Sequence, residues 1–234
     1  MAFTRYTLLI AAVILTACAG APPVSPPPTT PAVATVARQP ITVESPLSKV
    51  FGLAAGAQWI YETNRTDECV GRGVSKTAHG AITETVTSAW QLDGAQVFEL
   101  RVESCLLGEQ LETTEYYVTL DDTLYRTASP PEMLIQARGR GYEAMLLATW
   151  PATIGQTFGT SNKGAWRVVD QMPVDWVEGR ADGCAHLQRR STNNEEEIWF
   201  CEGLGIVRHT IRQFGQRINE EEKSLAARTG AAAP

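Results

Sequence analysis

Apolar and polar positions alternate over much of the chain between residues 48 and 215, which is the pattern of half-buried β-strands. The segment 81–90 (AITETVTSAW) shows this alternation and carries five β-branched residues. Asp93-Gly94 follows it and is typical of a two-residue hairpin turn, so the next strand is expected at 96–104. Further strand-like segments lie at 58–62, 113–120, 124–127, 166–170, 185–190, 197–201 and 206–214. Short strands separated by turn residues predict a mainly β fold, either a single antiparallel curved sheet or an open barrel-like domain.

One short helical insertion is expected within this β-domain, at 131–136 and again at 142–149. Pro130-Pro131 suits the start of a helix and Trp150-Pro151 its end, because proline lacks the backbone N–H that an interior helical position needs. After the β-domain, residues 216–234 begin with the charged sequence QRINEEEK. This composition predicts a charged tail that is helical or disordered.

The first residues have the order of a secretory signal peptide. Arg5 precedes an apolar run from Leu8 to Leu15, which is too short to span a bilayer, and small residues follow it. The tetrapeptide Leu15-Thr16-Ala17-Cys18 comes next and resembles the lipobox of bacterial lipoproteins. This resemblance implies that residues 1–17 are a signal peptide cleaved before Cys18. It also implies acylation of the Cys18 sulfur and of the new amino group.

The lipobox resemblance implies a location in the cell envelope, and the next residue indicates which membrane. Ala19 follows Cys18, whereas an aspartate there would resemble an inner-membrane retention signal. In a Gram-negative host this implies the periplasmic face of the outer membrane.

With 26 acidic and 20 basic residues the formal net charge is −6, which argues against nucleic acid as a partner. The expected partners are the lipid bilayer, through acylated Cys18, and an envelope protein or the cell wall.

A proline-rich segment separates the acylated cysteine from the β-domain. Eight of the 13 prolines lie between Pro22 and Pro46, mixed with alanine, threonine, serine and valine. Such a composition cannot form a packed core and favours extended polyproline geometry. Residues 18–47 are therefore predicted to be a disordered tether that holds the β-domain, residues 48–215, away from the membrane.

Four cysteines remain once Cys18 is assigned to lipid, and an oxidising envelope favours their pairing. Cys184 and Cys201 flank a turn predicted at Thr192-Asn193, which would set them opposite each other on adjacent strands. Closing that loop would stabilise the fold by about 3 kcal/mol. These two cysteines are therefore expected to form a disulfide.

By elimination, Cys69 is expected to pair with Cys105, although four cysteines allow three connectivities. The alternative to disulfides is zinc, because Cys184, Cys201 and His186 have the composition of a metal site. A fourth ligand would then have to come from a distant part of the chain. We expect two disulfides and no metal.

No catalytic constellation stands out, and no catalytic residue or cofactor is assigned. The chain lacks a G-x-S-x-G nucleophile elbow and a phosphate-binding loop with its glycine frame. The segment 139–144 (GRGYEA) fits G-x-G-x-x-A, but no strand-to-helix unit precedes it. Together with Arg138 and Arg140, this segment is expected to be a mobile turn, with anion binding as the alternative.

The segment 199–208 (WFCEGLGIVR) resembles a signature of secreted bacterial and lipoprotein β-domains of unknown function, which reads aromatic-aromatic-x-x-Gly-x-Gly-x-Val-basic. Those domains also carry an early Leu-x-x-Gly-x-x-Trp-x-Tyr, matched here by Leu53, Gly56, Trp59 and Tyr61. The resemblance covers most of residues 47–214 in layout and implies an antiparallel, curved β-domain in the envelope, but no reaction. Gly203 and Gly205 would permit the tight turn between the last two strands. Cys201 departs from the usual small residue or proline at its position.

These observations predict an envelope lipoprotein with a non-enzymatic binding or assembly role. The first alternative is a carrier of lipid or of a small amphiphile, held in a hollow between the curved sheet and the helical insertion at 131–149. The second alternative is an envelope hydrolase, for which the sequence offers no recognisable residues.

Overall fold

β-Strands make up most of the part of the chain that the computed structural model describes. The described residues are 38–42, 44–69, 74–106, 109–138, 145–149, 151–159, 164–215 and 217–230. The predicted signal peptide, Cys18, most of the predicted tether and Arg140 lie outside them. Neither of the two short helices among the described residues is long and apolar enough to cross a membrane.

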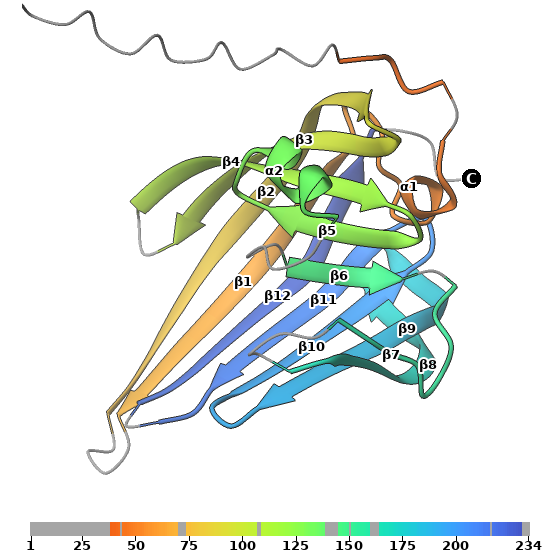
Figure 1. Cartoon of the computed structure of the whole chain (residues 1–234). Coiled ribbons are helices and arrows are strands. Elements are labelled where there is room, and N and C mark those ends of the chain that lie inside the picture. The colour runs from red at the N-terminus through yellow and green to blue at the C-terminus, as the bar shows by residue number, and fades with distance from the viewer. Residues whose placement is uncertain are drawn as a thin grey trace, which may run out of the picture. The chain divides into compact units, whose positions relative to one another are not determined.

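The strands follow one another along the chain, with one helix before β1 and one between β5 and β6. Their bounds are α1 Pro46–Val50, β1 Gln58–Cys69, β2 Val74–Leu92, β3 Ala95–Leu106, β4 Glu109–Leu120, β5 Thr123–Thr127, α2 Pro131–Gln136, β6 Met145–Thr149, β7 Thr157–Phe158, β8 Trp166–Trp176, β9 Gly179–Ser191, β10 Asn194–Cys201, β11 Gly205–Gln213 and β12 Arg217–Thr229. The described strands form one 12-stranded sheet in the order β6-β5-β4-β3-β2-β1-β12-β11-β10-β9-β8-β7. All pairs are antiparallel, and β1 pairs with β12. This is the order of an up-and-down barrel left open between β6 and β7, which confirms the predicted mainly β fold (Figure 1).

The sheet curls so that strands far apart in sheet order share one core. Phe98 of β3 and Leu124 of β5 belong to the same buried cluster as Val168 of β8 and Leu187 of β9. Figure 1 shows the two ends of the sheet on either side of the long strands β2, β1, β12 and β11. The sheet therefore has a concave face, where these apolar side chains meet, and a convex face.

The segment around α1 fills one end of the concave face. The side-chain oxygen of Ser45 caps this helix by accepting a hydrogen bond of 3.0 Å from the backbone N–H of Ser48. Leu47 and Phe51 are buried in the core. The Phe51 ring stacks on Phe200 of β10 with 3.9 Å between ring centroids. Apolar side chains thus occupy this end of the curled sheet.

The second helix packs on the convex face. Leu134 and Ile135 of α2 form a separate buried cluster with Val97 of β3 and Val118 of β4. Neighbouring residues on a strand point to opposite faces, so Val97 lies on the convex face while Phe98 lies on the concave one. α2 confirms the predicted helix at 131–136.

Backbone geometry confirms two predicted turns. Asp93 and Gly94, between β2 and β3, have φ angles of 49° and 83°, as expected for a two-residue hairpin turn with positive φ at both positions. Gly203, between β10 and β11, and Gly205, the first residue of β11, have φ angles of 75° and 79°. Glycine adopts such angles readily because it has no Cβ.

The prediction of a helical or disordered tail is wrong. Residues 217–229 form β12, which pairs with β1 on one side and with β11 on the other. The run of glutamates favours a helix locally, but β1 pairs with β12 along its length and β11 pairs with residues 219–224, so strand pairing overrides this preference. Lys223 and Leu225 are buried on one face of β12, which shows the two-residue period of a strand.

Two further boundaries differ from the prediction. Residues 145–149 form β6 at the sheet edge rather than a helix, because they pair with β5. The described end of the predicted tether is attached to the fold, since Gln39 forms a β-bridge with Gln91. The Arg38 guanidinium also lies 4.1 Å from the centre of the Trp90 ring. The folded unit therefore extends beyond both of its predicted limits.

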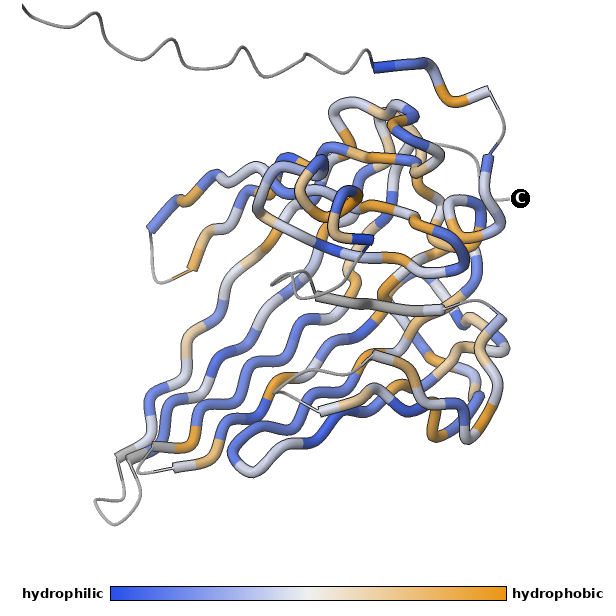
Figure 2. The backbone as a smooth tube through the Cα atoms, in the orientation of Figure 1, coloured by the Kyte–Doolittle hydropathy of each residue, from blue (hydrophilic) through white to orange (hydrophobic). Residues whose placement is uncertain are grey.

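Hydropathy changes along the long strands, as Figure 2 shows. The far ends of β1, β2, β11 and β12 are mostly hydrophilic, whereas apolar residues gather toward the end that α1 fills. On β4 the first six residues are exposed, and Tyr117 and Val118 near its end are buried. One end of the concave face is thus an apolar core, and polar side chains continue beyond it.

Candidate functional site

The polar part of the concave face contains a hollow of about 560 Å³. This volume lies within the range of roughly 300–1,000 Å³ that is usual for small-molecule sites. The lining comes from β2 to β5 and from β9 to β12, which face each other because the sheet curls. A smaller hollow of about 190 Å³ shares Ile211, Gln213 and Glu221 with it. We call the larger hollow the concave pocket.

Glu84 of β2 lines the concave pocket and is fully buried. Its Oε1 accepts hydrogen bonds from Lys223 Nζ of β12 at 2.5 Å and from Arg126 Nη1 of β5 at 2.9 Å. The Tyr117 hydroxyl donates to its Oε2 at 3.4 Å. Burial disfavours the charged carboxylate, but the two cations outweigh burial and lower the pKa of Glu84 to about 2. Glu84 is therefore ionised at neutral pH.

The partners of Glu84 have further contacts that compensate their charges. Arg126 Nε donates to Glu115 Oε2 at 2.5 Å. Lys223 Nζ lies 3.8 Å from the centre of the Tyr61 ring. Burial lowers the pKa of Lys223, while the nearby Glu84 carboxylate opposes that shift. Two carboxylates and two cations thus form one buried cluster across β2, β4, β5 and β12.

A second charged cluster lines the concave pocket on β9, β10 and β11. Glu196 is buried and binds Arg189 through one carboxylate oxygen, while His209 Nε2 lies 2.9 Å from the other. Burial raises the pKa of Glu196, but His209 and Arg189 outweigh burial and lower it below its usual value. The Arg189 guanidinium also lies 4.5 Å from the centre of the Trp166 ring. Its position is therefore fixed from two sides.

Apolar side chains also line the concave pocket, and two residues of its lining carry buried polar atoms without partners. Ile82, Val102 and Ile211 contribute apolar surface. Arg189 Nε and Asn194 Oδ1 are buried and have no hydrogen-bond partner in the described structure. Such atoms are uncommon in folded proteins, because each loses hydrogen bonds to water without replacement.

The concave pocket is chemically suited to binding. Three of its carboxylates, Glu84, Glu115 and Glu196, each have a cationic partner, so most of the charge on its lining is compensated. Apolar side chains lie on the same lining, so the pocket offers both kinds of contact to a ligand. Among the described residues, no three His, Cys, Asp or Glu side chains gather as metal ligands would.

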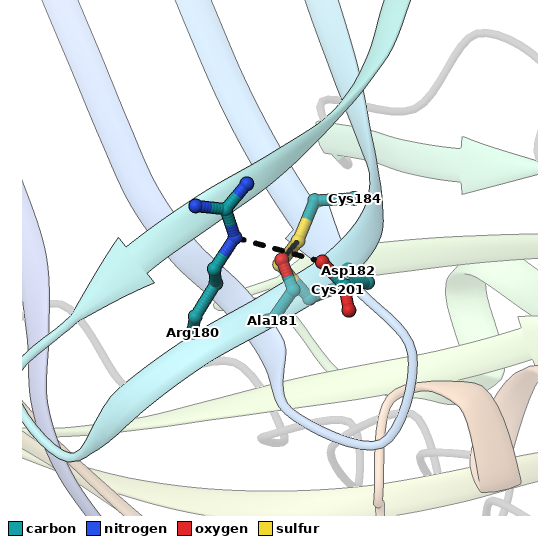
Figure 3. Close-up of a disulfide and its surroundings, with 5 residues drawn as sticks. All are labelled: Arg180, Ala181, Asp182, Cys184 and Cys201. Carbon is teal, nitrogen blue, oxygen red and sulfur yellow. Dashed lines mark hydrogen bonds and ion pairs between the residues drawn. A yellow bond between two sulfur atoms is a disulfide. The ribbon is translucent and has the colours of Figure 1, made fainter.

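The predicted disulfide between Cys184 and Cys201 is confirmed (Figure 3). Ser191 ends β9 and Asn194 begins β10, so the two-residue turn falls at Thr192-Asn193 as expected. The two cysteines then lie opposite each other with 4.2 Å between their Cα atoms. Both sulfur atoms are bonded to each other, so they are not thiolate ligands of the zinc site considered as the alternative.

The predicted pairing of Cys69 with Cys105 is wrong, because Cys105 is an exposed free thiol. Strand register explains the error. Cys105 on β3 lies opposite Ala81 on β2, which in turn lies opposite Glu62 on β1. Cys69 is seven positions further along β1, which corresponds to roughly 23 Å at 3.3 Å per residue. Pairing by elimination took no account of this register.

The remaining predicted site residues lie apart from the concave pocket or outside the described chain. Arg138 follows α2, is exposed and has a φ of 47°. Arg140 and the segment 139–144 are outside the described residues, so anion binding at that turn stays a prediction. Cys18 is also outside them, and its acylation stays a prediction.

The charged residues of the concave pocket were not among the predicted site residues. One signal could have found them, namely a charged residue at a strand position where the alternation calls for an apolar side chain. Glu84 stands between Ile82 and Val86, two positions away on either side. Lys223 likewise stands two positions before Leu225, and Arg126 two positions after Leu124. A charge at such a position must be buried and paired.

No model of a protein family matches the chain, and no curated protein matches it. Several solved structures match the chain, among them the following two. A protein from Parabacteroides distasonis, described as a lipoprotein, has 9% identity and a TM-score of 0.51, and the alignment covers 76% of this chain and 96% of that one. A protein from Bacteroides fragilis, described as exported and as having a YmcC-like fold, has 13% identity and a TM-score of 0.47, with 76% and 97% covered. The likeness to the Parabacteroides protein shows a shared fold.

Proposed function

We propose that this chain is an envelope lipoprotein, anchored through acylated Cys18, whose β-domain binds a small amphiphile in the concave pocket without transforming it. The tetrapeptide ending at Cys18 supports the anchor, and Ala19 supports the periplasmic face of the outer membrane. The Parabacteroides protein with the same fold is described as a lipoprotein, which agrees with this assignment.

The observation that carries the binding role is the concave pocket itself. A hollow of about 560 Å³ combines compensated charges with apolar walls on the inside of a curled sheet. A ligand with a polar and an apolar part would satisfy both kinds of surface. This supports the carrier function, expected as an alternative from the sequence, over an assembly role. The expected position of the hollow was wrong: it lies on the concave face and not between the sheet and the insertion at 131–149, because α2 packs on the convex face.

An assembly role with a protein or cell-wall partner would need an extended docking surface. Among the described residues, the large exposed apolar side chains fall on six different elements or connections, namely Leu111, Met133, Ile154, Met172, Val177 and Phe214. Interaction sites more often present contiguous apolar patches. The concave pocket is therefore the better-supported site.

The test is native mass spectrometry of the acylated full chain purified from membranes. We expect a fraction of the wild-type chain to carry one non-covalent small molecule. Ser104→Trp should sharply reduce that adduct, because Ser104 lines the concave pocket and an indole there would occupy part of the hollow.

Glu103→Trp is the matched control, since Glu103 precedes Ser104 on β3 and its half-exposed side chain lies on the other face. This variant should retain the adduct. The absence of any adduct from the wild type, or equal adducts in both variants, would contradict the proposal.

A further inference from the structure

The lining of the concave pocket reaches the strand ends that lie farthest from α1. Ser104 and Thr113 line it near the end of β3 and the start of β4. Asn194 and Gln213 line it at the first residue of β10 and the last residue of β11. Figure 1 shows these strand ends on the side of the sheet away from α1. We call them the mouth of the concave pocket.

Two large exposed apolar side chains lie at this mouth, on opposite walls. Leu111 of β4 is 62% exposed and lies opposite Ser104 in the register. It is two positions from Thr113 and so shares the concave face with it. Phe214 follows the last residue of β11, and its backbone N–H donates at 2.9 Å to a carbonyl in the turn between β9 and β10. Burial of both side chains against an apolar surface would be favourable.

The charges beside Leu111 indicate which kind of surface fits. Glu109 and Glu112 are exposed on the same strand, and the remaining residues of β4 include no lysine or arginine. An anionic surface would repel this end of the sheet, whereas a zwitterionic one would not.

The length of chain between the proposed acyl anchor and the fold allows the mouth to reach the bilayer. The chain joins the sheet where Gln39 pairs with Gln91 at the end of β2. In the register Leu111 lies level with Ile82 of β2, which is nine positions from Gln91 and thus roughly 30 Å away. Residues 19–37 could span roughly 65 Å at full extension. The mouth can therefore lie at the same surface that holds the anchor.

We infer that the mouth docks on a zwitterionic lipid bilayer through Leu111 and Phe214, so that an amphiphile passes directly between the bilayer and the concave pocket. The bilayer is the membrane that holds the acyl anchor. This inference rests on the proposed function and adds the surface through which the ligand enters.

The test places the acylated full chain in phosphatidylcholine vesicles that contain nitroxide-labelled phosphatidylcholine. A bimane on Cys105 is the probe, because this thiol is free and exposed and lies opposite Gln110, the neighbour of Leu111. Cys69→Ser in every sample keeps the label at Cys105. We expect the nitroxide lipid to quench the bimane of the wild type, relative to vesicles without nitroxide.

Substitutions at the rim test which side chains make the contact. Leu111→Asp should lower the docking equilibrium constant at least about tenfold, as expected for the loss of one buried apolar side chain, and with it the quenching. Phe214→Asp should act in the same direction. Leu111→Phe keeps an apolar side chain and should be quenched like the wild type.

Val177→Asp is the matched control. Val177 is 73% exposed and lies in the turn between β8 and β9, at the opposite end of the strands from the mouth. The same change from an apolar to an acidic side chain should leave the quenching at the wild-type level there.

The outcomes separate this inference from the proposed function. An unquenched wild type, as expected if a protein or a second copy covers the rim, would overturn the docking surface. Equal quenching in Leu111→Asp and Val177→Asp would also overturn it. If quenching follows the rim substitutions but native mass spectrometry finds no adduct, the docking surface stands and the proposed binding role fails.

Discussion

Glu84 and Lys223, 139 positions apart in the sequence, form an ion pair of 2.5 Å inside the curled sheet. Glu84 belongs to β2 and Lys223 to β12, the two strands that flank β1. Arg126 reaches the same carboxylate from β5. One buried carboxylate thus links strands from the beginning, the middle and the end of the described fold. The same cluster lines the concave pocket, so the proposed binding site and the stability of the fold depend on shared residues.

Glu84→Gln should strongly destabilise the fold. The substitution keeps the volume of the side chain but leaves Lys223 without its carboxylate partner and leaves Arg126 with Glu115 alone. Breaking a buried pair from one side typically lowers the free energy of unfolding by about 3–5 kcal/mol. Urea unfolding of the full chain, followed by tryptophan fluorescence, measures the change.

Asp182→Asn is the control for this prediction. Asp182 pairs with Arg180 at 3.7 Å, but its side chain is 89% exposed. Exposed pairs contribute about 0–1 kcal/mol, so this variant should unfold almost like the wild type. Equal effects of the two substitutions would contradict the assigned role of Glu84.

The stability that Glu84 contributes should disappear at low pH. Its pKa is about 2 in the folded chain, against an ordinary value of 4.5. The contribution is therefore fully present above about pH 4.5 and is lost as the pH falls toward 2, because the unfolded chain takes up the proton first. The shift corresponds to a contribution on the order of 3 kcal/mol.

The measurement compares urea unfolding of the wild type and of Glu84→Gln between about pH 5 and pH 2. The free energy of unfolding should fall more steeply for the wild type, and the two curves should converge at the acid end. Other carboxylates, including Glu196, titrate in both proteins and cancel in the comparison. Parallel curves would show that folding does not shift the pKa of Glu84.

Local sequence patterns predicted the features that depend on few residues. Asp93-Gly94 fixes a hairpin by backbone conformation alone. The Cys184–Cys201 disulfide followed from the position of a turn between two adjacent strands. Both features need only neighbouring segments, whose register the turn determines.

Features that depend on distant partners were not predictable in the same way. Residues 217–229 have the local composition of a helix, and only pairing with β1 and β11 makes them a strand. The concave pocket depends on the curl of the whole sheet, which brings Arg126 of β5 to Glu84 of β2. The wrong pairing of Cys69 with Cys105 has the same cause, since the register of three strands separates them.

Cys105 should react with iodoacetamide in the folded chain without reductant. Its thiol is free and exposed, whereas Cys184 and Cys201 are buried and bonded to each other. Peptide mapping by mass spectrometry should find Cys105 alkylated and the other two in one linked peptide pair. Recovery of Cys105 in a disulfide with Cys69 would instead support the original pairing.

Replacing Cys184 and Cys201 together by alanine should lower the free energy of unfolding by about 3 kcal/mol. Without the disulfide, the unfolded chain has more conformational entropy, which favours the unfolded state. The two cysteines are 17 positions apart, which is the loop length used for this value. Urea unfolding without reductant measures the change, and Cys105→Ala serves as the control with no lost disulfide. A double variant as stable as the control would show that the disulfide adds nothing to folding.

Cys18→Ala should release the chain from stable membrane anchoring by acyl groups. Each buried methylene of an acyl chain contributes about 0.8 kcal/mol, and two or three chains give a stable anchor. Detergent phase partitioning of cell envelopes, combined with intact-mass measurement, should find the wild type acylated and in the detergent phase. The variant should lack the acyl mass and also retain its uncleaved signal peptide, since the cleavage motif ends at Cys18. Cys105→Ala, which removes the exposed thiol of the folded domain, should be acylated and processed like the wild type. A Cys18→Ala chain that still carries acyl groups would show that the lipid is attached elsewhere.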